Sequence, residues 1–393
     1  MPMESLARFV LLPELRLIGQ KHLQPATNIY IAQKERPKHE VCPRCATPAT
    51  AYYDKRTVTV RDEPLRNNHV KLVIHKHRFW CKKCKKPFTE PIVGVMPGRR
   101  TTQRYRRSLM KACEDFTDLS RVRKTYQCST ALVYKILYEQ LELKWREYQY
   151  SWPKKVGIDE HFFRRQQGRA QFATVLTDLT NKRVKELCFG KRGEEIFSQL
   201  LHVEGRHEVR LVCMDLAEVY RKFSINYFPN ARIVADKLHV LRLLSPYLLK
   251  ERRAISGSNI TGLGRRLLLG PSWKLDYFEK RVVWERLKDF PKLNELYWWK
   301  ESLHKLYRTK GRVRAERALE AMITQAKTSS LKEVQTLGRT LKSWKEEILN
   351  YFDYRITNAT TEGFNNVAKV VQRRAYGYKS FRNYRLRVLS ACA

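Results

Sequence analysis

Acidic residues are scarce in this sequence. Its 393 residues include 78 Lys and Arg but only 39 Asp and Glu, so the formal net charge is +39 before histidine is counted. The basic excess runs along the whole chain and predicts a polyanionic partner. Nucleic acid is the first candidate, because basic side chains placed at phosphates release condensed counterions. A membrane surface is the weaker alternative.

Long apolar runs are also missing. No stretch of about 18 apolar residues is present, which argues against a transmembrane helix. The first residues place Glu4 and Pro13 where a signal peptide needs a basic and then an unbroken apolar segment. We therefore expect a chain that stays in the reducing cytoplasm and has no membrane partner. Its nine cysteines are then expected to be metal ligands and small core residues, not disulfides.

Two Cys-x-x-Cys pairs give the strongest local signal. They are Cys42-Pro-Arg-Cys45 and, after 35 further residues, Cys81-Lys-Lys-Cys84. Four thiolates presented at two turns can hold Zn²⁺ tetrahedrally, and the metal supplies folding energy that a small segment lacks. Segments 57–62 and 70–80 alternate as strands do, so the gap is expected to hold an inserted hairpin of a zinc ribbon. His75 and His77 are alternative ligands, but we expect them to be solvated strand residues.

Residues 101–147 are predicted to form three helices. The expected segments are 104–116, 117–126 and, after a Ser129 or Thr130 cap, 131–145. A tight turn before a capped third helix is typical of a helix-turn-helix, which places its last helix in the major groove. Tyr134 and Lys135 on that helix are candidate DNA contacts. A helical hairpin packed on the next domain is the alternative, although the basic stretch at 98–107 favours DNA.

After Pro153 the pattern changes to alternating strands and helices. Strands are predicted at 155–160, 172–178, 183–189, 211–215 and 231–236, with helices at 194–201 and 217–223. This order predicts an α/β fold with a ribonuclease-H-like mixed sheet, in which ligands lie outside the strand ends. Asp215 and Asp236 each end a strand and are expected at one edge of the sheet. The pattern from about 241 to 354 is helical and strongly basic.

The segment 358–378 is predicted to be a helix, with Thr360 or Thr361 as its N-cap and Gly377 just beyond its end. One face is expected to carry Glu362, Asn365 or Asn366, Lys369 and Arg373, and the other Phe364, Val367, Val370 and Val371. A carboxylate followed by an amide and two cations suits a metal ligand beside a phosphate track. A solvated amphipathic helix is the alternative on this segment alone.

Asp159, Asp215 and Glu362 can be combined into one site. Three carboxylates are able to hold two Mg²⁺ or Mn²⁺ ions about 4 Å apart, because hard cations prefer oxygen ligands. One ion can activate water or a DNA 3′-hydroxyl while the other stabilises the departing oxygen. The carboxylates therefore predict phosphodiester cleavage and strand transfer.

Other polar residues are expected to support this site. Asp236 is the rival for the middle acidic position, and His239, about one helical turn later, is expected to support the site with it. The candidate contacts to DNA phosphates beside the cut are Lys369, Arg373 and Arg374.

Several motifs resemble the ISL-three family of insertion-sequence transposases. They are G-I-D-E at 157–160, M-D-x-x-x-x-Y at 214–220, F-P-N-A-R-I-V-A-D-K-L-H-V at 228–240 and T-E-G-F-N-N-V-A-K-V-V-Q-R-R-A-Y-G-Y at 361–378. The cysteine pairs, with R-D-E-P between them, look like that family's zinc-binding domain. The resemblance covers most of the chain and implies a DDE recombinase. It assigns Asp159, Asp215 and Glu362 to the three acidic positions, with Asp159 favoured over its neighbour Glu160.

The resemblance and the charge together imply a DNA transposase with double-stranded transposon ends and target DNA as partners. It would act as a homodimer or larger assembly on DNA in the bacterial cytoplasm, associated with the nucleoid. A non-catalytic DNA-binding regulator and a structure-selective nuclease are the alternatives. The expected organisation is an N-terminal segment with a polar connector at 1–38, a zinc-binding ribbon at 39–95, a helix-turn-helix at 98–150, a catalytic domain at 151–240 and 355–393, and a helical insertion at 241–354.

Overall fold

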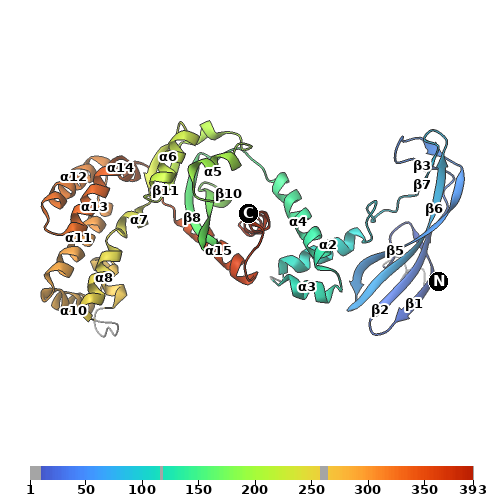
Figure 1. Ribbon diagram of the computed structural model, residues 1–393, viewed down its shortest axis with the longest axis horizontal. Helices are drawn as coiled ribbons and strands as arrows, with labels where there is room; N and C mark the ends of the chain where they lie inside the picture. Colours follow the sequence, from blue (N-terminus) through green and yellow to red (C-terminus); the bar gives the residue numbers. More distant parts are fainter. Residues whose placement is uncertain (1–9, 116–117, 257–263, 393) are drawn as a thin grey trace. The chain divides into compact units, whose positions relative to one another are not determined.

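The structure is a computed structural model that describes residues 10–115, 118–256 and 264–392. The chain forms two compact units, Met1–Lys144 and Trp145–Ala393 (Figure 1). Within the described ranges, none of the helices combines the length and the apolar character that crossing a bilayer requires.

A five-stranded sheet dominates the first unit. Its strand order is β1-β2-β6-β5, with β7 paired to the end of β6; β2 and β6 are parallel and the other pairs are antiparallel. Arg66 and Asn67 form the two-residue turn between β5 and β6, and both have positive φ, which matches the twist of a hairpin. The strands are β1 Leu15–Leu23, β2 Thr27–Lys34, β5 Tyr52–Leu65, β6 Asn68–Cys81 and β7 Lys86–Thr89, and a separate pair is formed by β3 Glu40–Val41 and β4 Pro48–Ala49.

The hairpin predicted between the two cysteine pairs is confirmed by β5 and β6. Leu72 and Ile74 of β6 are fully buried and pack with Val60 of β5. The polar connector expected before Pro37 is wrong, because residues 15–34 form β1 and β2 of the same sheet. Ala32 of β2 is fully buried in that core. Only one face of these strands is covered, so their composition is too polar for a strand prediction.

Three helices complete the first unit in the predicted order. The Ser129 hydroxyl accepts a hydrogen bond from the backbone N–H of Leu132 at 3.2 Å, as predicted for a capping residue. Arg106 and Glu139 join the first and third helices by an ion pair of 2.7 Å. The predicted boundary between the first two helices, at residues 116 and 117, lies outside the described residues. The helices are α2 Gln103–Asp115, α3 Leu119–Thr125 and α4 Thr130–Glu147.

A second five-stranded sheet forms the centre of the second unit, with the order β10-β9-β8-β11-β12. β8, β11 and β12 are parallel, whereas β9 is antiparallel to both β8 and β10. The strands are β8 Lys155–Gln166, β9 Arg169–Asp178, β10 Arg183–Phe189, β11 Leu211–Met214 and β12 Arg232–Ala235. β8 is longer than the predicted strand, so Asp159 lies within it and not near its end.

Helices cover both faces of this sheet. Leu176 and Cys188 pack on one side with residues of α5 and α6, and Val175 and Leu187 pack on the other with α15 and α16. Asn350 of α14 donates a hydrogen bond to the backbone oxygen of Ile233 in β12 at 2.8 Å. The helices are α5 Gly193–Gln199, α6 Glu218–Tyr227, α7 Lys237–Leu241, α14 Lys345–Tyr354, α15 Ala359–Arg374 and α16 Phe381–Ala391, with a 3-10 turn at Arg206–Glu208.

The segment 241–354 is helical in its described parts, as predicted. Its buried side chains join the core on the α5 and α6 side of the sheet, because Leu296, Leu319 and Ile348 belong to one cluster with Val212 and Val234. The remaining elements are α8 Ser245–Ser256, α9 Arg265–Leu269, a 3-10 turn at Ser272–Lys274, α10 Tyr277–Lys288, α11 Pro291–Arg308, α12 Arg312–Thr328 and α13 Lys332–Ser343.

Candidate functional site

The register of three parallel strands places three aspartates beside one another. The last paired level of the ladder consists of Ile158, Met214 and Ala235. The next residue along each chain is Asp159, Asp215 or Asp236. Neighbouring strands lie about 4.8 Å apart, so side chains at one level of the ladder are close neighbours. The predicted convergence of Asp215 and Asp236 at one edge of the sheet is confirmed.

The carboxylates of Asp159, Glu160 and Asp215 form one cluster, in which an oxygen of each lies within 4.8 Å of the others. Burial raises the pKa of Asp159, and burial together with the charge of Glu160 raises the pKa of Asp215 to about 6. One oxygen of Glu160 and one of Asp215 are buried without a hydrogen-bond partner in the described chain. Buried carboxylate oxygens that lack donors fit a hard divalent cation such as Mg²⁺ or Mn²⁺.

Glu160 is the member of this cluster that the sequence pattern did not select. Asp159 accepts a hydrogen bond from Asn365 of α15 at 2.8 Å, whereas Glu160 interacts with the Tyr220 hydroxyl of α6. The two neighbours therefore face different helices, as strand alternation predicts. The glutamate side chain is nevertheless long enough to bring one oxygen close to Asp215. Strand alternation gives the side of the sheet on which a residue lies, but it does not predict how far its side chain extends.

Glu362 is not a member of this cluster of described carboxylates. It forms an ion pair with Arg242 at 3.6 Å, and its side chain is 46% exposed. One turn earlier, Asn358 donates its backbone N–H to Asp236 and its side-chain amide to the backbone oxygen of Ile158, each at 2.8 Å. Asn365, nearly one turn later, contacts Asp159. Glu362 thus belongs to the stretch of α15 that is anchored on β8 and β12.

The start of α15 differs from the prediction. The helix begins at Ala359 with Asn358 in the capping position, so Thr360 and Thr361 lie inside its first turn. The two hydrogen bonds of Asn358 fix the chain before either threonine, which explains the earlier start. Gly157 allows the close approach, because a Cβ there would lie 2.3 Å from the Thr361 hydroxyl oxygen.

The buried face of α15 also differs from the predicted valine face. Thr361, Asn365 and Ala368 are buried, whereas Val367 is exposed and Phe364 is half-buried. Phe364 and Val371 of the predicted apolar face do pack against the core, but Asn365 is buried as well because it is held by polar contacts in the protein interior. The three candidate DNA-binding cations of this helix, Lys369, Arg373 and Arg374, are exposed.

Asp236 caps α7 and so has few free acceptor positions. Its side chain accepts from the backbone N–H groups of Leu238 and His239, from the His239 ring at 3.1 Å and from Asn358. Burial opposes ionisation, but the hydrogen bonds of His239 and Asn358 hold the pKa of Asp236 below its usual value. The hydrogen bond to Asp236 and the charge of Asp215 raise the pKa of His239. Asp236 therefore fits a supporting role beside the carboxylate cluster.

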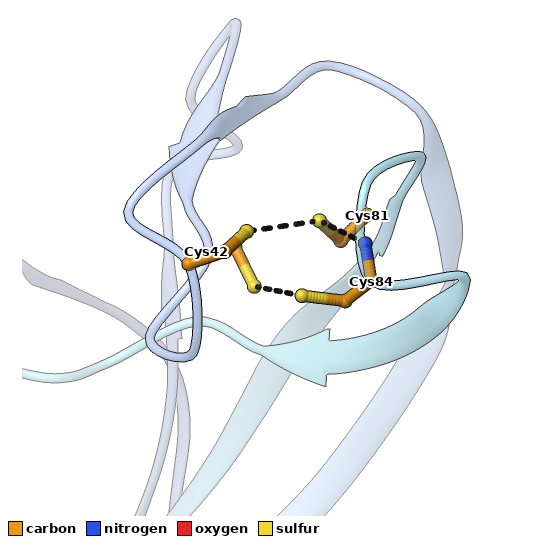
Figure 2. A group of neighbouring side chains, drawn as sticks. Cys42, Cys81 and Cys84 are labelled. Carbon is orange, nitrogen blue, oxygen red and sulfur yellow. Dashed lines mark hydrogen bonds between the residues drawn. The ribbon is translucent and has the colours of Figure 1, made fainter.

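The four cysteines of the two Cys-x-x-Cys pairs meet at one point of the first unit. Their sulfur atoms all lie within 4.8 Å of one another. The Sγ atoms of Cys42 and Cys84 are 4.0 Å apart and those of Cys45 and Cys81 are 3.5 Å apart. Sulfurs around a tetrahedral zinc ion are about 3.8 Å apart, so the spacing fits Zn²⁺. Figure 2 shows Cys42, Cys81 and Cys84 turned toward one another at this point.

The other five cysteines are buried, as expected for small core residues, and no cysteine of the described ranges forms a disulfide. His77 is not the solvated residue that was expected, because it is buried and its ring contacts Glu90 at 3.1 Å. That carboxylate also accepts the backbone N–H of His77. His75 instead contacts Thr57 at 2.9 Å on the exposed side of the hairpin.

The predicted DNA-contacting residues of α4 are accessible. Tyr134 is 43% exposed, and Lys135 beside it is also exposed, whereas Tyr138 is buried with Ile136 and Leu137. The helix therefore packs through one face and leaves Tyr134 and Lys135 available.

Two family models match this chain. A family model described as a transposase of the ISL3 type matches residues 156–388, and a model for the zinc finger of transposases IS204, IS1001, IS1096 and IS1165 matches residues 38–84. The transposase for insertion sequence element IS1001 from Bordetella parapertussis is 24% identical over 382 residues, which cover 93% of this chain and 92% of that protein.

A second relative matches only a short segment. An ATP-dependent protease from Lactococcus lactis subsp. lactis is 38% identical over 55 residues, which cover 14% of this chain and 18% of that protein. The ISL3 model, by contrast, spans more than half of the chain and includes Asp159, Asp215 and Glu362. The chain carries a zinc ribbon and belongs to the ISL3 family of DDE transposases.

Proposed function

We propose that this protein binds the terminal inverted repeats of an insertion sequence and catalyses metal-dependent strand cleavage and strand transfer. The observation that carries the proposal is the cluster of Asp159, Glu160 and Asp215, with two buried oxygens lacking partners among the described residues. Glu362 lies on α15 between Asn358, which is hydrogen-bonded to Ile158 and Asp236, and Asn365, which is hydrogen-bonded to Asp159. The sheet has three parallel strands, β8, β11 and β12, and continues beyond β8 with β9 and β10, each antiparallel to its neighbour, which supports a ribonuclease-H-like catalytic domain.

Asp159, Asp215 and Glu362 would hold the Mg²⁺ or Mn²⁺ ions, and Glu160 is a further candidate ligand. Bound ions supply Lewis-acid chemistry, which lowers the pKa of water or a 3′-hydroxyl and stabilises the leaving oxygen. Asp236 and His239 would support the site, because Asp236 ties the start of α7 to the start of α15.

DNA binding is assigned to two groups of exposed residues. Lys369, Arg373 and Arg374 follow Glu362 on α15 and would contact phosphates beside the cut. Tyr134 and Lys135 on α4 would contact the transposon end, with the three helices of the first unit acting as a helix-turn-helix and the zinc ribbon beside them. Bringing two ends together requires at least a dimer on DNA, and the site of action would be the bacterial nucleoid.

The experiment uses DNA that carries the inverted repeats flanking the gene, with Mg²⁺ or Mn²⁺. The wild-type chain is expected to release nicked and joined products. Asp159→Asn, Asp215→Asn and Glu362→Gln are each expected to lower the rate by at least about 100-fold, because each weakens the metal site. Full activity in Glu362→Gln together with loss in Glu160→Gln would instead make Glu160 the third carboxylate.

The same assay separates the two alternative functions. A structure-selective nuclease would cut branched or unpaired DNA and give no joined product. A regulator without catalysis would bind the inverted repeats and leave them intact with either metal. The buried carboxylate cluster argues against the regulator, because a DNA-binding regulator has no use for buried carboxylates whose charges raise the pKa of Asp215.

A further inference from the structure

We propose that Tyr384, His161 and Asn365 form a directional hydrogen-bond relay that orients the Asp159 carboxylate, an inference that rests on the proposed function of the carboxylate cluster. The relay starts on α16, crosses β8 and ends on α15. Its members are positioning residues, since only Asp159 belongs to the cluster itself. Through Tyr384, the relay would give α16 a part in positioning the Asp159 carboxylate.

Three short contacts connect these residues in one line. The Asn365 Nδ2 atom donates to Oδ2 of Asp159 at 2.8 Å. Its Oδ1 atom lies 2.9 Å from Nδ1 of His161, and Nε2 of His161 lies 2.6 Å from the Tyr384 hydroxyl. His161 and Asn365 are each 3% exposed and Tyr384 is fully buried. The contacts join residues more than 200 positions apart in the chain.

The direction of each hydrogen bond follows from the chemistry of the groups. An ionised carboxylate only accepts, so Asn365 must turn its NH₂ group toward Asp159 and its oxygen toward His161. That oxygen also only accepts, which requires the His161 proton on Nδ1. In the neutral ring, Nε2 is then left to accept from the Tyr384 hydroxyl, which lies 2.6 Å from it and 3.2 Å from the backbone oxygen of Ala368. A flipped Asn365 amide would place its oxygen against the Asp159 carboxylate, which also only accepts.

The surroundings argue against a role in packing alone. The rings of Tyr384 and Phe163 are stacked with their centroids 5.0 Å apart, and Ala368 and Val388 belong to the same apolar core. Apolar side chains would fill such a space with no desolvation cost, whereas buried polar groups are tolerated only when they are paired. Polar partners that hold a metal-binding side chain in one orientation strengthen metal binding. A relay that ends on Asp159 therefore has a use that packing does not explain.

Substitutions with matched controls test the relay in the full-length chain. Asn365→Ser and Tyr384→Phe each break one contact, and Asn366→Ser and Tyr376→Phe make the same changes at exposed neighbours. Asn365→Ser is expected to raise the Mn²⁺ concentration at half-saturation, followed by electron paramagnetic resonance, by roughly 10-fold or more. Its kcat for DNA cleavage should fall, with KM for DNA unchanged. Tyr384→Phe should give a smaller change in the same direction.

A spectroscopic measurement tests the direction without any change in folding. Nitrogen-15 spectra of histidine-labelled protein, with His161 assigned by its loss in His161→Gln, should show the proton on Nδ1. A proton on Nε2 alone, or Mn²⁺ binding in Asn365→Ser equal to that in Asn366→Ser, overturns the relay. If the wild type binds Mn²⁺ but cleaves no DNA, the proposed function fails while the tautomer and the Mn²⁺ shift still decide the relay.

Discussion

At the scale of single residues, Asp215 has unfavourable electrostatic surroundings when no cation is bound. Its pKa is raised from 3.8 to about 6 by burial and by the charge of Glu160. The folded protein therefore holds this proton more tightly than the unfolded chain does. The contribution of this carboxyl group to stability without bound metal is largest below about pH 4 and is lost as the pH rises from about 4 to about 6.

We therefore expect Asp215→Asn to stabilise the protein in buffer without Mg²⁺ or Mn²⁺, by roughly 1 to 3 kcal/mol at pH 7.5 and by less at pH 5. Adding Mg²⁺ should raise the melting temperature of the wild type but not of the variant. Thermal unfolding at both pH values measures this, with exposed Asp289→Asn as the control. Equal melting temperatures for Asp215→Asn and the wild type at pH 7.5 would contradict the electrostatic account.

The residues of the site were predictable to different degrees. Asp215 and Asp236 follow apolar strand segments, and a parallel register needs only that pattern to bring their side chains together. Glu160 was not predictable, because its place in the cluster depends on side-chain reach and not on strand alternation. The sequence placed Asn365 or Asn366 on the face of α15 that carries Glu362, but it did not predict the contacts with Asp159 and His161 that bury Asn365. Such contacts between distant segments leave no periodic signal.

At the scale of elements, the packing of α15 on β8 decides where Glu362 and Asn365 lie. A Cβ atom on Gly157 would lie 2.3 Å from the Thr361 hydroxyl and 2.5 Å from the Asn358 side-chain oxygen. Gly363, on the same helix, has no such neighbour within 4 Å in the described structure. The two glycines therefore predict opposite responses to the same substitution.

Gly157→Ala is expected to lower the free energy of unfolding by about 1 to 3 kcal/mol, because α15 must shift to make room. The shift displaces Glu362 and Asn365, so metal-dependent cleavage should fall with it. Gly363→Ala should instead stabilise the protein by up to about 1 kcal/mol, since alanine is the better helix former. Chemical denaturation and a cleavage assay measure both effects. A neutral Gly157→Ala would show that α15 does not depend on this close approach.

The elements of the first unit show the same limit on prediction. The hairpin of β5 and β6 was predictable because both strands alternate over many residues and end near the cysteine pairs. Strands β1 and β2 were missed, because a sheet with only one covered face needs few apolar residues in its strands. The burial of His77 was also not predicted, because it depends on a contact with Glu90, which follows β7 in the sequence.

At the scale of the whole molecule, the net charge of +39 dominates the expected interaction with DNA. Each cation that neutralises a phosphate steepens the dependence of binding on salt by about 0.9 in a plot of log K against log salt. Arg373 and Arg374 are exposed at the end of α15 and are expected to contribute in this way. Removing contacts of this kind weakens binding to all DNA sequences alike.

The double variant Arg373→Gln, Arg374→Gln is expected to reduce that slope by about 2 and to weaken specific and non-specific DNA equally. This is checked by measuring the binding constant between about 50 and 300 mM salt, on DNA with and without the inverted repeat. The binding constant is expected to change by factors on the order of ten. The double variant Lys327→Gln, Lys332→Gln is the control, because both lysines are exposed on the helical insertion. If binding weakens only on DNA that carries the inverted repeat, the arginines contact bases and not only phosphates.

The parallel register of β8, β11 and β12 also constrains how this gene can change over evolutionary time. Codons can be gained or lost between α7 and α14 without moving Asp159 or Asp215, because their spacing depends on the strand ladder. Loss of a single codon inside β11 would turn Asp215 to the opposite side of the sheet, since side chains alternate along a strand. Such frame-preserving deletions should therefore be eliminated from the paired parts of these three strands.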